Sequence, residues 1–255
     1  MNLIDTHTHL YLPEFETDRQ EVVEAAIWAG VNKMLMPNID LSTLTPMLKL
    51  AKAFPRHCYP MIGLHPTSVK EDYRQQLNEL YIHLKEGSYV GIGEVGIDLY
   101  WDKTYRKEQT EAFRQQIEWA LSFNLPLVIH SRESLPLIFS VLEEFPQLPG
   151  GVFHSFTGTR NQAEYAIEKG FFLGIGGIVT FKNSTLKDTL LPLGPEHLVL
   201  ETDAPFLAPA PKRGKRNESS YLVFIAQFLA VLFSMDPETL AEITTRNAQN
   251  LFLLT

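Results

Sequence analysis

The sequence contains a single cysteine, Cys58, among its 255 residues. One cysteine excludes an intramolecular disulfide and any metal site built from several thiolates. Positive charge is also scarce, because 22 lysines and arginines stand against 30 aspartates and glutamates, giving a formal net charge of −8. This balance argues against a general binder of polyanions, although a locally positive mouth could still accept nucleic acid.

Long apolar runs are missing as well. The longest, residues 221–233, is interrupted by Gln227 and is too short to cross a bilayer. Asp5 comes almost at once, so the N-terminus lacks the charged-then-apolar pattern of a signal peptide. We therefore expect a cytoplasmic protein in a reducing compartment, with no membrane association and no obligate protein partner.

Short apolar runs alternate with longer amphipathic runs along the whole chain. The expected strands are 3–7, 33–37, 59–64, 89–95, 125–130, 151–154, 171–175 and 197–201. The expected helices are 17–29, 42–53, 72–86, 105–123, 132–145, 160–169, 183–191, 217–234 and 236–252. Ser42, Asp72 and Asp236 are the expected N-caps.

Strand followed by helix, eight times over, implies parallel strands joined by right-handed crossovers. At this length the pattern predicts the α/β class and a (β/α)8 TIM barrel with an additional C-terminal helix. We expect one barrel domain, residues 1–255. Residues 91–96 fit the dinucleotide pattern G-x-G-x-x-G, but the apolar residues 97–101 follow where that motif needs a helix. The glycines are better explained by backbone passing close to a crowded site.

Side chains that bind metals recur at the ends of the predicted strands. His7 and His9 are two residues apart, so both imidazoles leave the same face of the first strand. The remaining candidates end or follow strands four, five, six and eight: Glu94, His130, His154 and Asp203. Any one histidine is more often a packing residue than a ligand. The whole set falls at the carboxyl ends of the strands, where barrel enzymes build their active sites, and this indicates that the chain has an active site there.

Four imidazoles and two carboxylates are too many for one tetrahedral ion but enough for two ions that share a carboxylate. Two ions about 3.5–4 Å apart clamp the attacking and leaving oxygens of a displacement. Nitrogen-rich ligation suits Zn, Mn or Fe better than Ca or Mg, although availability and geometry can override affinity. We expect two divalent ions per chain, either Mg, Mn or Zn, with Asp203 also able to take a proton from the attacking water. Four residues are placed to orient ligands: Asp5, Asp98, Glu201 and Ser131.

Six segments carry a family resemblance. They are Asp-Thr-His-Thr-His at 5–9, Ile-Gly-Leu-His-Pro at 62–66, Gly-Glu-Val-Gly-Ile-Asp at 93–98, Pro-Leu-Val-Ile-His-Ser-Arg at 126–132, Phe-His-Ser-Phe-Thr-Gly at 153–158 and Glu-Thr-Asp-Ala-Pro at 201–205. In this order they resemble the motifs of the TatD-related metal-dependent deoxyribonucleases of the amidohydrolase-like superfamily. The match continues past residues 213–218.

The resemblance implies a two-metal barrel that hydrolyses phosphodiester bonds of DNA, in several relatives as a 3′-to-5′ exonuclease. It implies that Glu94 bridges the two ions and that His65 acts on the substrate side. The implied ligands are His7, His9, Glu94, His130, His154 and Asp203. Two departures from the family pattern, Tyr11 and the pair 135–136, bear on substrate preference rather than on metal chemistry.

Cationic residues suit an anionic substrate. They are Arg132 and the cluster Lys212, Arg213, Lys215 and Arg216, which follows Asp203 and is expected above the metals. The leading hypothesis is a deoxyribonuclease in which Asp203, Glu94 and His65 are catalytic and single-stranded DNA or its 3′ ends are the substrate. One alternative is an amidohydrolase-like hydrolase of a C–N, lactone or ester bond, although Glu94 stands where such enzymes carry a carboxylated lysine. Another is a non-enzymatic binding protein, which would have little use for six converging ligands.

Overall fold

The computed structural model describes residues 1–254, so Thr255, the last residue of the expected domain, lies outside it. Eight strands form in the predicted order. They are β1 Leu3–Asp5, β2 Val31–Pro37, β3 Cys58–Met61, β4 Ile92–Asp98, β5 Leu127–Arg132, β6 Gly151–Phe153, β7 Phe171–Ile175 and β8 Leu198–Leu200. Neighbouring strands pair in parallel, in a run from β1 to β3 and a run from β4 to β8.

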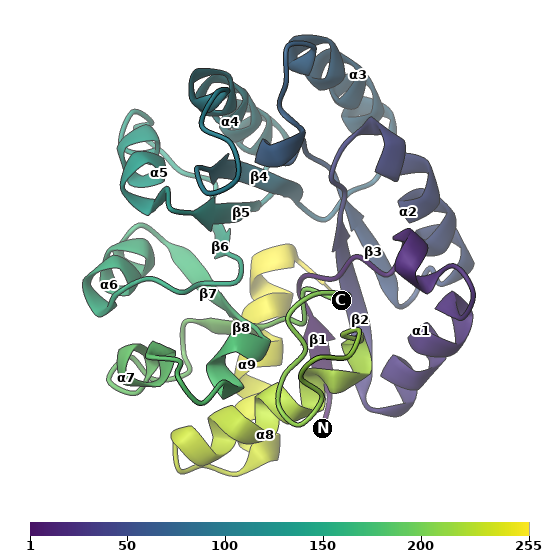
Figure 1. Cartoon of the computed structure of the whole chain (residues 1–255), viewed down its shortest axis with the longest axis vertical. Coiled ribbons are helices and arrows are strands. Elements are labelled where there is room, and N and C mark those ends of the chain that lie inside the picture. Colours follow the sequence, from purple (N-terminus) through teal and green to yellow (C-terminus); the bar gives the residue numbers. More distant parts are fainter. Residues whose placement is uncertain (255) are drawn as a thin grey trace.

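Single bridges join the two runs on both sides. Ile62 pairs with Ile92 next to β3 and β4, and Thr8 pairs with Ala204 beyond β1 and β8. At the second seam the His9 amide donates to the Ala204 carbonyl at 2.7 Å. The strands therefore follow one another around a ring, which Figure 1 shows with the helices around it, except the yellow C-terminal helix, which lies across the ring. The predicted (β/α)8 barrel is confirmed.

The helices follow the strands as predicted, mostly with shorter bounds. They are α1 Arg19–Trp28, α2 Leu41–Ala53, α3 Tyr73–Glu86, α4 Arg106–Phe123, α5 Leu135–Leu142, α6 Arg160–Glu168, α7 Leu186–Leu190, α8 Leu222–Leu232 and α9 Pro237–Phe252. The helix expected from residue 132 begins later because Arg132 still belongs to β5. Within residues 1–254 no single helix is long and apolar enough to cross a membrane, and only α8 with its preceding turn passes that test together with α9, across a bend of 111°.

Two of the three predicted N-caps hold their positions. Asp236 caps α9 by accepting hydrogen bonds from two backbone amides. Asp72 stands at the N-cap of α3, but its side chain makes no capping hydrogen bond. The prediction for Ser42 is wrong, because α2 begins one residue earlier and Asp40 is its cap. The Asp40 carboxylate accepts from the amides of Ser42 at 2.9 Å and Thr43 at 3.2 Å, and the Thr43 hydroxyl closes a capping box.

The run of glycines at 91–96 enters a strand rather than a helix. β4 continues through it to Asp98, and the next helix begins only at Arg106. A Cβ on Gly93 would lie 2.6 Å from the Val128 Cβ on β5, and Gly96, at φ +131°, would place one 2.1 Å from the His130 carbonyl oxygen. Both glycines allow the close approach of β4 to β5. Because no helix begins at these glycines, the dinucleotide-binding motif is excluded.

The helix α9 closes the amino-terminal end of the ring. Its last turns pack against apolar side chains that point inward from the strands, and the cluster is Ile4, Leu35, Met61, Val128, Val152, Val199, Ala248, Phe252 and Leu254. The Asn247 amide donates to the Leu198 carbonyl at the start of β8. Burying a side chain such as Phe252 contributes about 1.5–3 kcal/mol. The additional C-terminal helix is therefore confirmed, and it leaves the opposite end of the barrel free for polar groups.

Candidate metal centre

The six predicted ligands gather at the carboxyl end of the barrel. His7 and His9 follow β1, His154 follows β6 and Asp203 follows β8. The other two, Glu94 and His130, lie inside their strands, because β4 runs four residues past the first and β5 two past the second. The predicted ends of these strands were too early. Side-chain direction still brings all six to one place.

Glu94 lies at the centre of the cluster. Its Oε1 atom is 2.8 Å from His130 Nδ1, 2.9 Å from His154 Nε2 and 3.2 Å from His65 Nε2. Its Oε2 atom faces the other side, 3.2 Å from His7 Nε2. The carboxylate is almost fully buried. One buried anion therefore stands between two groups of imidazoles, the position that a bridging ligand requires.

The electrostatics keep both acidic candidates ionised. Burial raises the pKa of Glu94, but the neighbouring His154, His65 and His7 outweigh it and hold that pKa well below its usual range. Burial likewise raises the pKa of Asp203, but the neighbouring imidazoles of His9, His154 and His7 lower it overall. Carboxylates that stay charged in a buried site need cations close by.

The donor atoms fit divalent ions. Three groups each bring their nitrogen and oxygen atoms within 4.8 Å of one another: His7–His9–Glu94, His7–His154–Asp203 and His65–Glu94–His130. The Nε2 atoms of His7 and His9 lie only 3.2 Å apart, close enough to serve as ligands of one ion. Imidazole and carboxylate together suit Zn, Mn or Fe.

Tyr11 fixes the protonation of His9. The Tyr11 hydroxyl donates its hydrogen to the Pro37 carbonyl at 2.5 Å, so its oxygen accepts from His9 Nδ1 at 2.8 Å. His9 Nδ1 therefore carries a hydrogen, and Nε2, which faces Asp203 Oδ1 at 3.6 Å, is the nitrogen that would bind a metal. The expectation that Tyr11 bears on substrate preference rather than on metal chemistry is therefore wrong, because its hydroxyl contacts the predicted ligand His9. Its partner on β2 could not be read from the sequence.

Replacing Tyr11 with phenylalanine should weaken metal binding without altering the fold. The His9 ring would lose the acceptor that sets its tautomer, and a loss of this kind costs about 10- to 100-fold in metal affinity or activity. Titration of the metal-free variant with Mn or Zn measures the change. Tyr89→Phe, three residues before β4 begins, is the matched control. Equal affinities for both variants would contradict the role given to Tyr11.

Two predicted orienting carboxylates join elements around the ligands. Asp5 accepts hydrogen bonds from the Thr202 amide at 2.9 Å and hydroxyl at 2.6 Å, which ties β1 to the end of β8. Its burial raises the pKa of Asp5 to about 7. Glu201 accepts from the Ser155 amide, and its Oε1 atom stands 3.5 Å from His154 Nδ1, where it can orient that ring. Glu201 therefore stands next to the candidate ligand His154, and Asp5 binds Thr202, the residue before the candidate ligand Asp203.

Asp98 makes the most direct contact of the orienting residues. Its Oδ2 atom lies 2.9 Å from His130 Nε2, while its Oδ1 atom accepts from the amides of Tyr100 at 2.9 Å and Trp101 at 3.2 Å. Ser131 differs from the expectation, because its hydroxyl lies 3.3 Å from the hydroxyl of Ser134. It supports the turn into α5 rather than a ligand.

His65 faces Glu94 but keeps a different protonation from His9. Its Nδ1 atom accepts from the Thr67 amide at 3.1 Å, which leaves the ring hydrogen on Nε2, 3.2 Å from Glu94 Oε1. In this tautomer the nitrogen that points into the centre is a donor. The arrangement is consistent with the expected substrate-side role, which stays a prediction.

A cavity of about 570 Å³ opens above the cluster. Among the expected substrate residues, His65 and Arg132 line it, whereas Lys212, Arg213, Lys215 and Arg216 do not. Arg216 binds both carboxylate oxygens of Asp18, at 2.9 and 2.6 Å, and also contacts Glu218 at 3.1 Å. The aromatic ring of Phe181 lies under the Arg213 guanidinium at 4.4 Å.

The loop after β8 explains why this basic cluster is turned aside. Asn217, fully buried, donates to the carbonyl oxygens of Thr202 at 2.7 Å and Phe206 at 2.6 Å. These bonds fold the loop back on its own start, and Lys212 rests over the Tyr221 ring next to α8. The cluster does not line the cavity above the candidate ligands, because Arg216 pairs with Asp18 and Glu218 while Lys212 and Arg213 lie over aromatic rings. Its role in substrate binding stays a prediction.

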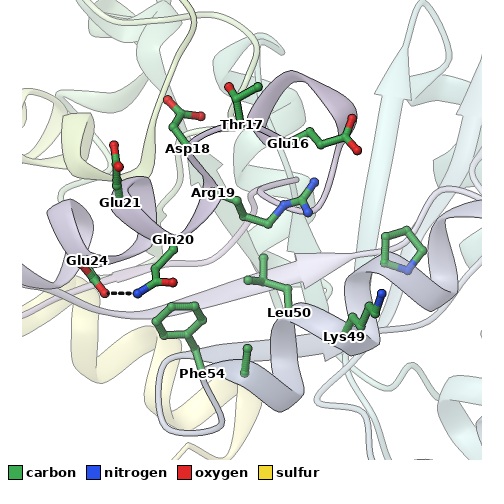
Figure 2. A pocket seen from close by; sticks show the side chains of 12 residues that line it. Glu16, Thr17, Asp18, Arg19, Gln20, Glu21, Glu24, Lys49, Leu50 and Phe54 are labelled. Atoms are coloured by element: carbon green, nitrogen blue, oxygen red, sulfur yellow. Dashed lines mark hydrogen bonds between the residues drawn. The ribbon is translucent and has the colours of Figure 1, made fainter.

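A second hollow, of about 880 Å³, lies on the outer surface between α1 and α2. Figure 2 shows its acidic side chains, among them Glu16, Asp18, Glu21 and Glu24, beside Arg19 and Lys49. None of the candidate ligands lines it. The chemistry of the molecule is therefore concentrated at the carboxyl end of the barrel.

Barrels of parallel strands that gather imidazoles and ionised carboxylates at this end are built for metal-assisted hydrolysis, and this chain is a metal-dependent hydrolase. The chain belongs to the TatD related DNase family, whose profile matches residues 4–253. The resemblance read from the six motifs is confirmed.

Individual relatives cover the chain from end to end. An uncharacterized metal-dependent hydrolase, YabD, of Bacillus subtilis is 38% identical, with 98% of each chain covered. The 3′-5′ ssDNA/RNA exonuclease TatD of Salmonella typhimurium is 33% identical, again with 98% of each chain covered. A crystal structure of a TatD homologue, YJJV, from Escherichia coli superimposes with a TM-score of 0.92 at 28% identity, covering 99% of this chain and 98% of that one.

Proposed function

We propose that this protein removes nucleotides from the 3′ end of single-stranded nucleic acid, chiefly DNA, with two divalent ions. The observation that carries the proposal is Glu94, a buried carboxylate whose two oxygens face histidines on opposite sides. Support for the substrate comes from relatives named as exonucleases of single-stranded DNA and RNA. The six ligands in the proposal are those predicted from the sequence: His7, His9, Glu94, His130, His154 and Asp203.

The donor atoms suggest how the ligands divide. His7, His9 and Asp203 would hold one ion, His130 and His154 the other, and Glu94 would bridge them. When bound, two such ions polarise the phosphate and lower the pKa of an attacking water toward neutrality. We propose that the native metal is Mg, Mn or Zn, and the nitrogen-rich donor set favours Mn or Zn.

The protein's own side chains would transfer protons and hold the phosphate. Asp203 lines the cavity with a side chain that is 14% exposed, and its pKa is lowered, so it can take a proton from the nucleophile. His65 Nε2–H is placed to donate to an oxygen of the substrate. Arg132, on the wall of the cavity, can grip a phosphate with two parallel hydrogen bonds.

A substrate and polarity screen tests this function. The purified protein, loaded with Mn, Mg or Zn, is given a 5′-labelled single strand, the same strand in a duplex, an RNA strand, and representative lactones and amides. We expect the single strand to shorten stepwise from its unlabelled 3′ end. Hydrolysis of lactones or amides without any cleavage of nucleic acid would show that the alternative hydrolase is correct.

Arg132 and Arg216 should differ in the salt dependence of DNA binding. If Arg132 contacts one phosphate, Arg132→Gln should flatten the slope of log K against log salt by about 0.7 for a single strand. Arg216→Gln should leave the slope unchanged, because that guanidinium is already paired with Asp18 and Glu218. Fluorescence anisotropy in chelator measures both variants.

The reverse result, a flatter slope for Arg216→Gln alone, would restore the basic cluster as the phosphate-binding surface. Thermal unfolding provides the internal control for this pair. Arg216→Gln should unfold at lower temperature, since it leaves Asp18 without its partner, whereas Arg132→Gln should not.

A further inference from the structure

Two aromatic residues stand at the mouth of the metal centre. Trp101 is 71% exposed and lines the cavity together with Asp98 and Arg132, and its neighbour Tyr100 is 49% exposed. Scattered exposed apolar residues are ordinary, but here an indole borders a cavity whose floor is made of charged groups. The contacts around Trp101 show whether its loop is held in place.

The loop that carries Trp101 is fixed to the metal centre. One oxygen of Asp98 accepts the Tyr100 and Trp101 amides, and the other bonds His130 Nε2 at 2.9 Å. The Arg132 guanidinium lies 3.7 Å from the centre of the Tyr100 ring and 5.1 Å from that of Trp101. A single carboxylate thus sets the position of both a candidate ligand and the aromatic pair, and the cation packs against that pair.

The opposite side of the mouth is apolar as well. Phe206 is 47% exposed and Leu207 42% exposed, and both line the cavity from the loop after β8. In a ring of eight strands β4 and β8 are half a turn apart, so these residues face the β4 loop across the opening. The site has a charged floor and an aromatic rim. A ligand that fits both carries an anion and a flat apolar ring a few bonds away.

We propose that Trp101 is the platform on which the base of the terminal nucleotide stacks, with Arg132 beside it on the phosphate. The proposal rests on the proposed function and names how that substrate is held. Stacking tolerates any base because every base has a π-face, which suits an enzyme that removes successive nucleotides. Arg132, packed on Tyr100, is pre-positioned so that base and phosphate are recognised together.

The test compares a normal strand with one whose 3′-terminal nucleotide lacks its base. Trp101→Ala should lower kcat/KM for the normal strand by roughly 5- to 150-fold, the range expected when one base loses its aromatic partner. The same variant should cleave the abasic strand as wild type does. Trp101→Phe should recover most of the loss, and Trp28→Ala, at a 94% exposed residue of α1, is the matched control.

A second readout does not depend on turnover. In chelator, the normal strand should quench tryptophan emission of the wild-type protein more than that of Trp101→Phe, which retains Trp28 and Trp119. Equal cleavage of the normal strand by wild type and Trp101→Ala would overturn the platform and leave the nuclease function intact. Equal losses on both strands would also overturn it, since Trp101 would then only support Asp98. If loaded wild-type protein cleaved neither strand, the proposed function itself would fail.

Discussion

Replacing Glu94 with alanine should lower turnover by several orders of magnitude while the barrel remains folded. The side chain supplies both oxygens that face the two groups of imidazoles, so its loss removes the proposed bridge and leaves two cations without an anion between them. The fold should survive because the apolar cluster at the other end of the barrel, closed by α9, does not involve Glu94.

Three measurements separate loss of the bridge from loss of the fold. Metal analysis should show fewer than two ions per chain in Glu94→Ala, circular dichroism should be unchanged, and Glu94→Gln should be nearly as inactive because an amide lacks the charge. Glu242→Ala on α9, an exposed glutamate far from the centre, is the control. Near-wild-type turnover of Glu94→Ala with saturating Mn or Mg would refute the bridging assignment.

Removing the divalent ions should abolish hydrolysis altogether, and returning them should restore it. The chelated protein should also unfold more easily, because a ligand that binds only the folded state contributes about 2.7 kcal/mol when present at 100 times its dissociation constant. Mass spectrometry of the reloaded protein should find two ions per chain. Each added equivalent of metal should raise the unfolding temperature until two are bound.

The choice of metal provides the control for this experiment. Mn or Zn should restore activity at lower concentration than Ca, which prefers oxygen donors, whereas four of the six proposed ligands are imidazoles. Saturation at one ion with full activity would reduce the proposal to a single-metal site. Activity that persisted through exhaustive chelation would contradict a role for metals at Glu94.

The framework of the site could be predicted from the sequence because short-range patterns determine it. Apolar strands alternate with amphipathic helices, and β7, Phe171–Ile175, has the predicted bounds. The end of β5 was misplaced because the strand continues through the polar residues Ser131 and Arg132, and that of β4 because it continues through Gly96 to Asp98. Parallel strands nevertheless fix which end of the barrel each candidate ligand occupies, so Glu94 and His130 still meet.

Long-range pairing was beyond the reach of the sequence. The basic cluster looked free to bind phosphate, but Arg216 pairs with Asp18, 198 residues earlier in the chain. Tyr11 looked like a departure from the family pattern, and its role depends on the Pro37 carbonyl on β2. In both cases the decisive partner comes from a distant segment that carries no local signal.

The seam between the first and last strands has a consequence for the moment at which the enzyme becomes active. The Thr6 hydroxyl donates to the Leu200 carbonyl, and Thr202 binds Asp5, across 194 and 197 residues. His7 and His9 leave the ribosome early, but their partner Asp203 is synthesised almost 200 residues later. A chain interrupted during synthesis cannot complete this site, so incomplete products would carry metal-binding groups without an assembled nuclease.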